Sequence, residues 1–327
     1  MRVLVTGGAG YVGSHTCKVL AAKGIEPIVF DSLANGHREA VRWGPLIVGD
    51  IRDKASLLKA LTEYEIEAVF HFAALAYVGE SVLRPDSYYD VNVAGTARLL
   101  EAMRETGVGR IVLSSSCATY GIPDKVPIDE GQPQKPINPY GRTKLICEQM
   151  LSDHSTAFGL QYAILRYFNA AGCDHEGQLV EKHDPETHLI PRALMAAGGF
   201  GPELQIHGTD YETPDGTAIR DYIHVGDLAT AHWLAFDRLT RNADPVALNL
   251  GTGRGFSVKE IIEMVERVTG LSVPESRGPR RPGDPPVLVA ATARSAEVLG
   301  FAPKHSDLES IVRTAWRGIQ AVYGASP

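Results

Sequence analysis

The sequence predicts an α/β protein in which a doubly wound parallel sheet is joined to a smaller, loop-rich C-terminal unit. Three observations predict this fold class. Short β-branched runs alternate with amphipathic segments through the first half of the chain, and a glycine-rich turn follows the first run. After about Gly172, segments punctuated by proline and glycine replace this alternation.

The apolar runs of the first half are short and β-branched, which is typical of buried strands, and the segments between them have helical periodicity. The predicted strands are residues 3–6, 27–30, 46–48, 68–72 and 110–114, and the predicted helices begin near Tyr11, Lys54, Tyr89 and Pro139. Strands that alternate with helices form parallel sheets. We therefore expect the ligand site in the loops at the carboxyl ends of these strands.

The predicted division of the chain falls at residue 172. Residues 1–172 form the first domain in this interpretation, and residues 173–327 form most of the second. Residues 247–250 are a short apolar run that is typical of a buried strand. We therefore expect part of the second half, about residues 220–250, to return to the main domain.

Composition limits the classes of protein to which the chain can belong. Its 327 residues, 44% hydrophobic and 22% charged, are typical of a folded protein with a sizeable core. The net charge of −7 argues against a general nucleic-acid surface. The four cysteines form no C-x-x-C pair, and neither a signal peptide nor an apolar run of ~20 residues is present. We expect a soluble, cytoplasmic protein with no nucleic-acid or membrane partner.

The glycine-rich turn at residues 7–13, GGAGYVG, has the form G-x-x-G-x-x-G. Such glycines let backbone amides approach a pyrophosphate at the start of the following helix, although a tight turn without a ligand is the alternative interpretation. Asp31 closes the second strand, 18 residues after Gly13. A carboxylate there accepts hydrogen bonds from ribose hydroxyls and repels a 2′-phosphate. Together these features favour NAD over NADP.

Two more strand ends offer cofactor contacts. Asp50 follows the third run and could meet the adenine amino group; the alternative is a helix N-cap, a role that suits Asp53 better. Phe72, Ala73 and Ala74 follow the fourth run. Small side chains there would let a flat cofactor lie against the backbone, and close packing alone is the alternative.

A possible acid–base group follows the fifth run, which ends in Ser114, Ser115 and Ser116. Tyr140 and Lys144, four residues apart, share one face of the next predicted helix. A neighbouring cation favours the phenolate of a tyrosine, whose ordinary pKa is ~10. Y-x-x-x-K alone usually marks a solvated helix face, but its place after a serine-ended fifth strand, behind a dinucleotide loop, favours catalysis.

Several motifs in a fixed order make the chain similar to a known family. They are VLVTGGAGY (3–11), YVGES (77–81), SSS (114–116), NPYG (138–141), LRYFN (165–169), DGT (215–217), RDYIHV (220–225) and RRPGD (280–284). Through nearly its whole length the chain resembles the extended short-chain dehydrogenases, which have a Rossmann sheet, and within them the UDP-glucose (UDP-galactose) 4-epimerases. The resemblance implies an NAD-dependent enzyme that inverts C4 of a UDP-hexose through a transient 4-keto sugar.

Carried over position by position, the resemblance implies three groups of site residues and no metal site. Tyr140 is implied as the base, Lys144 as the modulator of its pKa, and Ser116 as the hydroxyl donor at the sugar O4. The implied NAD contacts are Gly7, Gly10, Tyr11, Val12, Gly13, Asp31, Ser32, Asn35, Gly36, Asp50, Ile51, Phe72, Ala73, Ala74, Asn92, Ser114, Tyr140, Lys144 and Phe168. The implied UDP-sugar contacts are Ser116, Tyr140, Asn169, His188, Leu189, Gln205, His207, Arg220, Arg281 and Asp284.

The same resemblance bears on the reaction and the sugar. Related dehydratases carry an acidic pair after the active-site hydroxyl, where this chain has Cys117 and Ala118, so dehydration is disfavoured. Leu288 stands where some members have a large aromatic residue, and Ala76 where many have a lysine near the cofactor. A UDP-xylose/UDP-arabinose or UDP-N-acetylhexosamine 4-epimerase is the enzymatic alternative, and a non-catalytic dinucleotide sensor is the alternative from another class. A homodimer, common in this family, is expected.

Overall fold

The main element of the chain is a parallel seven-stranded sheet with the order β10-β6-β5-β4-β1-β2-β3. The computed structural model describes residues 1–281 and 284–324, so Pro282 and Gly283 of the RRPGD motif lie outside the described residues. The strands of this sheet are β1 (Arg2–Thr6), β2 (Glu26–Asp31), β3 (Leu46–Val48), β4 (Ala68–His71), β5 (Arg110–Ser116), β6 (Gln161–Tyr167) and β10 (Val246–Leu250). The predicted fold class is confirmed.

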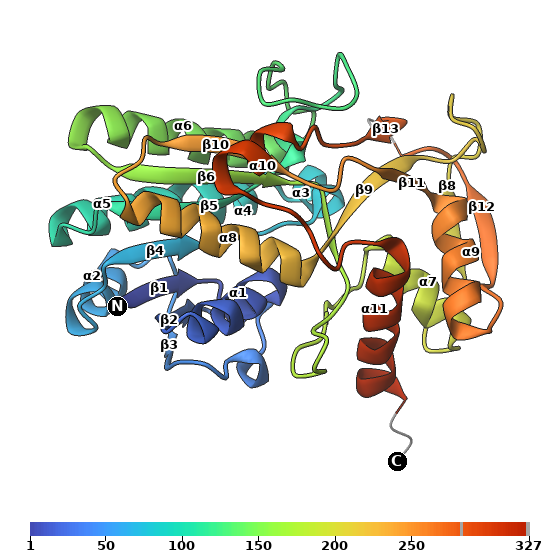
Figure 1. Ribbon diagram of the computed structural model, residues 1–327, viewed down its shortest axis with the longest axis horizontal. Coiled ribbons are helices and arrows are strands. Elements are labelled where there is room, and N and C mark those ends of the chain that lie inside the picture. Colours follow the sequence, from blue (N-terminus) through green and yellow to red (C-terminus); the bar gives the residue numbers. More distant parts are fainter. Residues whose placement is uncertain (282–283, 325–327) are drawn as a thin grey trace.

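Helices cover both faces of the sheet (Figure 1). Successive side chains of a strand point to opposite faces. Val3 and Val5 therefore pack against α1 and α8, whereas Leu4 packs against α2, α5 and α6. Burial on both faces explains why the strands are continuously apolar. The helices and helical turns of this part are α1 (Tyr11–Ala22), η1 (Arg38–Ala40), α2 (Lys54–Glu63), α3 (Val78–Leu83), α4 (Pro85–Tyr88), η2 (Tyr89–Ala94), α5 (Gly95–Thr106), η3 (Cys117–Thr119), α6 (Pro139–Phe158), α8 (Val225–Thr240) and α10 (Ala293–Leu299).

The remaining elements form a second group at one end of the molecule (Figure 1). A small sheet pairs β9 with β7, β11 and β13, and β8 pairs with β12. Three helices pack together through a separate apolar cluster that includes Leu194, Val265 and Ile311. The elements are β7 (Asn169–Ala171), α7 (Leu189–Ala197), β8 (Leu204–His207), β9 (Ile219–His224), β11 (Gly255–Ser257), α9 (Val258–Thr269), β12 (Glu275–Gly278), β13 (Val287–Leu288) and α11 (Leu308–Tyr323).

The C-terminal half contributes elements to the main sheet. β10 adds to its edge by parallel pairing with β6, and α8 packs on α1. A domain boundary at residue 172 therefore separates most of the two groups but not all of their elements. The division itself stays a prediction.

The helix expected near Tyr89 begins earlier. Pro85 occupies the first turn of α4, and the chain then continues through the π-helical turn η2 into α5. Proline suits a first helical turn because its missing N–H has no partner there. Within residues 1–281 and 284–324, no helix has the length and apolar character to cross a membrane.

The order of strands places a crevice beside β1. The strand next to β1 on one side is β2 and on the other is β4, so the chain winds away from β1 in both directions. Loops after β1 and β4 separate at such a point, where ligands bind in open parallel sheets. The fold therefore predicts a ligand site at the carboxyl ends of β1 and β4.

Candidate active site

A cleft of about 1790 Å³ runs along the carboxyl ends of the main strands and continues into the second group of elements. Its walls include the loops after β1, β2, β4 and β5 and residues of β7, β8 and β9. Among the residues that the sequence assigns to NAD or to the UDP-sugar, all except Asn92 line this cleft. Residues far apart in the chain are thus brought together in one place.

Asn92 lies behind the cleft wall. Its side chain is buried, accepts a hydrogen bond from the Leu75 backbone N–H at 2.8 Å and donates to the Leu75 carbonyl at 3.0 Å. It also donates to the Thr143 hydroxyl at 3.0 Å. Through these bonds Asn92 joins the loop after β4 to α6, and its expected contact with NAD stays a prediction.

The glycine-rich turn places open backbone amides at the cleft. Gly7 has φ +73°, and a Cβ there would lie 2.5 Å from the Ala73 nitrogen, so this position requires glycine. α1 begins at Tyr11 after Gly10, and no side chain caps its first amides. Free amides at the positive end of a helix suit a pyrophosphate. This turn fits the dinucleotide that the sequence predicts.

Asp31 lies at the end of β2 with its carboxylate buried in the cleft wall. One oxygen accepts from the Ala9 N–H at 3.0 Å and the other from the Leu33 N–H at 2.8 Å. A Cβ on Gly36 would lie 2.8 Å from the carboxylate, so glycine keeps this approach open. The two backbone bonds fix the carboxylate beside the glycine-rich turn, where a ribose would lie.

The two aspartates after β3 have different roles. Asp53 caps α2, accepting from the Ala55 N–H at 3.0 Å and the Ser56 N–H at 3.3 Å, as the sequence favours. Asp50 lines the cleft, and both its oxygens bind the Arg52 guanidinium, at 3.0 and 2.6 Å. The Arg52 side chain holds the pKa of Asp50 below its ordinary value. Asp50 is therefore an ionised acceptor at the edge of the cleft.

The Ser/Tyr/Lys group assembles where β5 meets α6. Ser116 ends β5, and Asn138 caps α6 by accepting from the Gly141 N–H at 2.8 Å. Lys144 is buried, and its Nζ lies 5.9 Å from the centre of the Tyr140 ring and donates to the Ser114 carbonyl at 2.8 Å. The predicted shared helical face is thus present, with the ammonium anchored to the backbone.

Burial changes the expected proton affinity of Tyr140. It raises the pKa of Tyr140 above the ordinary value, while Ser116 opposes this shift. Burial also lowers the pKa of Lys144. Burial therefore disfavours the Tyr140 phenolate, and the expected influence of Lys144 on its pKa stays a prediction.

The opposite end of the cleft is basic. Arg220 of β9 pairs with Asp284, and Arg281 lies nearby. Burial lowers the pKa of Arg281, and the charges of Arg192 and Arg220 add to this shift, whereas Asp284 opposes it. Arg280, by contrast, turns to Asp210 and stacks on Tyr211. A cleft end with three guanidinium groups suits a diphosphate.

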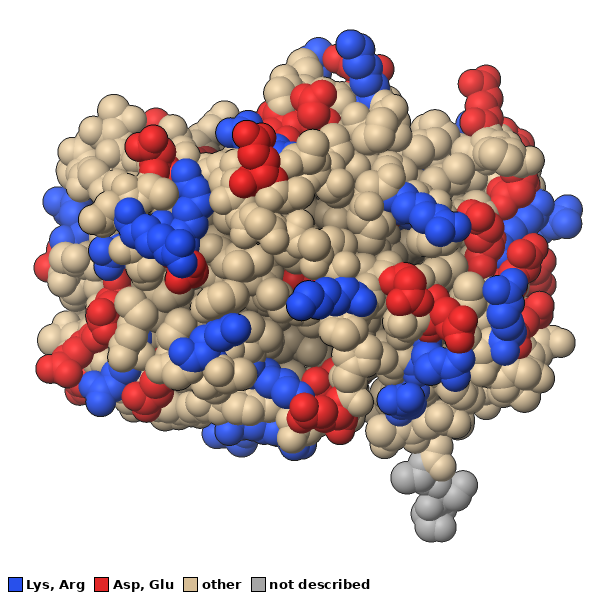
Figure 2. All heavy atoms as spheres, viewed as in Figure 1, with Lys and Arg blue, Asp and Glu red and all other residues tan. Residues whose placement is uncertain are grey.

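This basic site is local. On the face of the molecule that Figure 2 shows, acidic and basic side chains are interspersed and neither sign forms a continuous field. Sequence reasoning missed Arg192, which lines the cleft from the first turn of α7. The only available signal was its position just after His188 and Leu189, in a segment already assigned to the substrate.

Leu288 borders the cleft close to the catalytic group. It lies on β13 opposite Arg220, is half-buried, and packs against a cluster that includes Cys117 and Phe168. Leu288 therefore contacts both the apolar cluster and the open cleft. A larger side chain at this position would project into one of them.

Comparison with known proteins identifies the family. Residues 3–251 match the model of the NAD dependent epimerase/dehydratase family. The chain belongs to this family. NAD is its cofactor, in agreement with the fit of the glycine-rich turn and of Asp31. The recognition made from sequence motifs is confirmed.

Individual relatives are similar over nearly the whole chain. The UDP-glucose 4-epimerase of Rhizobium meliloti is 52% identical over 315 residues, 96% of each chain. The crystal structure of UDP-glucose 4-epimerase from Brucella ovis in complex with NAD is 57% identical, with a TM-score of 0.94 over 96% of this chain and 97% of that one. A Stenotrophomonas maltophila UDP-glucose-4-epimerase with bound NAD and formylated UDP-arabinopyranose is 41% identical, with a TM-score of 0.96 over the full length of both.

Proposed function

We propose that this chain is a UDP-glucose 4-epimerase, which interconverts UDP-glucose and UDP-galactose through a transient 4-keto sugar. The observation that carries the proposal is one cleft that joins a dinucleotide turn, a Ser/Tyr/Lys group and a cluster of guanidinium groups. The similarity to UDP-glucose 4-epimerases over 96% of the chain supports the same reaction.

Different residues of the chain bind different parts of NAD. The amides at the start of α1 hold the pyrophosphate, and Asp31 accepts hydrogen bonds from the adenosine ribose. Lys144 and Phe168, which also line the cleft, would contact the nicotinamide half of NAD, with Lys144 at its ribose. Bound NAD supplies the acceptor for the C4 hydrogen and, in its oxidised form, a positive charge that favours the Tyr140 phenolate.

Proton transfer at O4 falls to Tyr140. Its phenolate oxygen accepts the O4 proton as the C4–H bond breaks, and the resulting hydroxyl returns the proton to O4 after the 4-keto sugar has turned over. Ser116 hydrogen-bonds O4, and Lys144 keeps a positive charge near the phenolate from its anchor on the Ser114 carbonyl. General-base transfer of this kind contributes about 10²- to 10⁴-fold to a rate.

The guanidinium groups hold UDP while the sugar turns. Arg220, Arg281 and Arg192 surround the diphosphate, and Asp284 orients Arg220. Anchoring the nucleotide more firmly than the sugar leaves the pyranose free to present either face of C4. The proposed substrate residues Asn169, Leu189, Gln205 and His207 complete the wall around the nucleotide and sugar.

The direct test is incubation of the purified protein separately with UDP-galactose, UDP-xylose and UDP-N-acetylglucosamine, with NMR detection of the C4 epimers. UDP-galactose should be converted to UDP-glucose at the highest rate. Conversion of only the pentose or only the N-acetyl sugar would replace the UDP-hexose assignment. No conversion of any of them would favour a non-catalytic dinucleotide sensor.

Changing Asp31 to Ala should weaken NAD binding by at least about 10-fold and relax the preference for NAD over NADP. The change removes an acceptor for ribose hydroxyls, and hydrogen bonds to a charged group contribute about 1.5–3 kcal/mol each. Isothermal titration with both nucleotides measures the ratio. Asp31→Asn, which keeps the shape and one acceptor, separates loss of charge from collapse of the loop. An unchanged ratio in both variants would assign ribose recognition to another residue.

Changing Leu288 to Tyr should reduce turnover of UDP-N-acetylglucosamine more than that of UDP-glucose. A larger side chain between the cleft and the Cys117/Phe168 cluster fills the space beside the sugar, and overpacking costs about 1–3 kcal/mol, roughly 5- to 150-fold in the ratio of kcat/KM. Kinetics with both substrates and a melting curve measure this effect. Equal losses on both sugars together with a lower Tm would show that Leu288 acts only in packing.

We further propose that the chain acts in the cytoplasm as a homodimer. Support for the cytoplasm comes from its four buried, unpaired cysteines, which form no disulfide among the described residues. Exposed apolar side chains on α3, including Val82 and Leu83, are available for a partner chain. Light scattering of the purified protein measures its mass in solution.

A further inference from the structure

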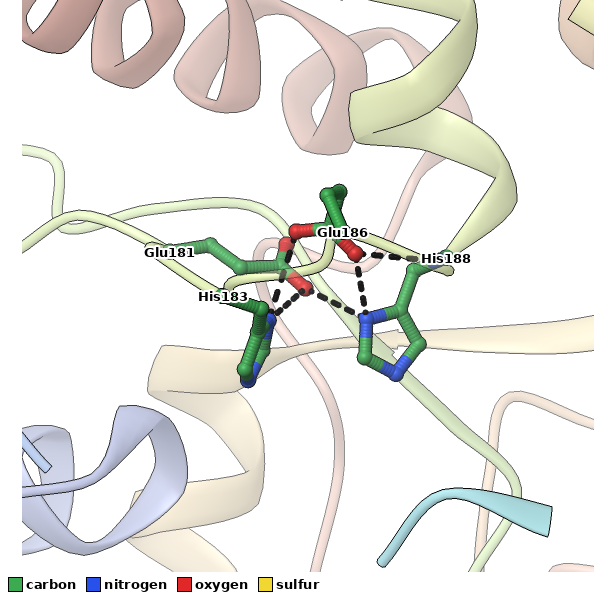
Figure 3. A group of neighbouring side chains, drawn as sticks. All are labelled: Glu181, His183, Glu186 and His188. Atoms are coloured by element: carbon green, nitrogen blue, oxygen red, sulfur yellow. Dashed lines mark hydrogen bonds and ion pairs between the residues drawn. The ribbon is translucent and has the colours of Figure 1, made fainter. Parts of the chain in front are cut away.

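Four side chains from one short segment converge beside the cleft. Glu181, His183, Glu186 and His188 lie just before α7 with the spacing E-x-H-x-x-E-x-H. One donor atom from each lies within 4.8 Å of the donor atoms of all the others. Figure 3 shows both carboxylates and both imidazoles directed at a common point.

Four of the donor–donor distances in this cluster are close to those in the coordination shell of a small cation. Nδ1 of His183 lies 3.4 Å from Glu181 and 3.3 Å from Glu186. Nδ1 of His188 lies 3.1 Å from Glu181 and 2.9 Å from Glu186. Four ligands at ~2.0–2.1 Å from a tetrahedral zinc ion are separated from one another by roughly 3.3–3.4 Å. The side chains are therefore spaced as ligands around a shared centre.

The buried carboxylate of Glu181 gives a second, independent indication of a ligand, because its hydrogen bonding is incomplete. Its side chain is only 3% exposed, and neither carboxylate oxygen has a hydrogen-bond donor. The Nδ1 atoms of both histidines are instead oriented to Glu186. Without an ion, Glu181 thus has the two Nδ1 atoms at 3.1 and 3.4 Å but accepts no hydrogen bond from either. A buried carboxylate oxygen that accepts no hydrogen bond is unfavourable.

We propose that Glu181, His183, Glu186 and His188 bind one divalent transition-metal cation, with Zn²⁺ preferred. Two imidazole nitrogens and two carboxylate oxygens are a ligand set that zinc accepts in tetrahedral geometry. Two neutral histidines and two carboxylates also balance the charge of a divalent ion. This site is absent from the sequence-based assignments, which include His188 only as a UDP-sugar contact.

The surroundings of the cluster give the ion a structural role at the cleft. The His183 ring lies edge-on to Tyr11 and Tyr77, with ring centres 5.9 and 6.1 Å away, so the cluster ties this segment to the start of α1 and to the loop after β4. Coordination through Nδ1 of His188 places its proton on Nε2, which points away from the cluster in Figure 3. Since His188 also lines the cleft, the ion fixes the ring as a donor for substrate.

The test measures metal binding by protein that carries no affinity tag. The wild type, stripped with a chelator and then incubated with ZnCl₂, should retain one zinc per chain after gel filtration, by elemental analysis. Substitution with CoCl₂ should give the intense visible absorption of tetrahedral Co²⁺. Zinc should also raise the Tm of the wild type.

Matched variants locate the site. E181Q and H183Q should each lose zinc affinity by more than about 100-fold, since changes to residues that only support the ligands already cost about 10- to 100-fold. E176Q alters an exposed glutamate of the same segment that pairs with Lys18, and should bind zinc like the wild type. If a variant does not fold, the zinc content and the cobalt spectrum of the wild type show whether the metal site exists. A metal-free wild type, or E181Q and H183Q that both bind zinc normally, would overturn the proposal.

Discussion

Replacing Tyr140 with Phe should lower turnover of UDP-galactose by at least about 10²-fold while changing UDP affinity little. Phenylalanine keeps the ring that packs in the cleft but removes the only atom of this side chain that accepts the O4 proton, and general-base loss costs about 10²- to 10⁴-fold. Steady-state kinetics and UDP titration measure the two effects separately. Affinity should be preserved because the guanidinium groups that we propose to bind UDP lie at the other end of the cleft.

Tyr64→Phe is the matched control for this variant. Tyr64 follows α2 and lies outside the cleft lining, so it loses the same hydroxyl at a distance from the reaction. Its turnover should equal that of the wild type. Near-normal turnover by Tyr140→Phe would contradict the role of Tyr140 as the base, and equal losses in both variants would point to a general effect of removing a hydroxyl.

Replacing Glu148 with Ala should reduce the free energy of unfolding by about 3–5 kcal/mol, because it leaves the buried Arg166 guanidinium without its carboxylate. Glu148 and Arg166 are 4% and 7% exposed and are joined by bonds of 2.7–3.2 Å. Glu148 also accepts from Ser115 at 2.5 Å and Gln134 at 2.9 Å. This network joins α6 to β5 and β6 directly behind the Ser/Tyr/Lys group.

Urea unfolding at a fixed protein concentration measures this loss. Glu309→Ala is the control, since it breaks an exposed ion pair with Arg313 on α11, and exposed pairs contribute about 0–1 kcal/mol. The double variant Glu148→Ala/Arg166→Met should be less destabilised than Glu148→Ala alone, because no charge is then stranded. A loss below about 1 kcal/mol for Glu148→Ala would show that water or another group solvates Arg166.

Local patterns predicted the main sheet because its strands are short and apolar and are followed by residues that favour turns. Residues 46–48 are β3 as predicted, and β5 extends two residues further, to Ser116. The small sheet was not predicted, because β7 pairs with β9 across about fifty residues, and such register depends on tertiary contacts rather than on local periodicity. Pro85 does indicate in the sequence where the helical segment that leads into α5 begins, because proline favours a first helical turn.

The site could be predicted where its chemistry depends on the spacing of residues along the sequence. Tyr140 and Lys144 share a helical face because they are four residues apart. The proton affinity of Tyr140 was not predictable, since it depends on burial beside residues distant in the sequence, such as Tyr88 and Tyr167. Asn92 was assigned to NAD by family resemblance. Its bonds to Leu75 and Thr143 could not be predicted, because no local pattern encodes the approach of these segments to one another.

The most direct test of C4 inversion is conversion of UDP-galactose in D₂O by the purified protein with a trace of NAD, followed by ¹H NMR. Because the hydrogen taken from C4 would be carried by bound NAD, without exchange with solvent, and returned to the same carbon, we predict that UDP-glucose accumulates to equilibrium with protium at C4. The absence of UDP-glucose, or product that carries deuterium at C4, would contradict this account.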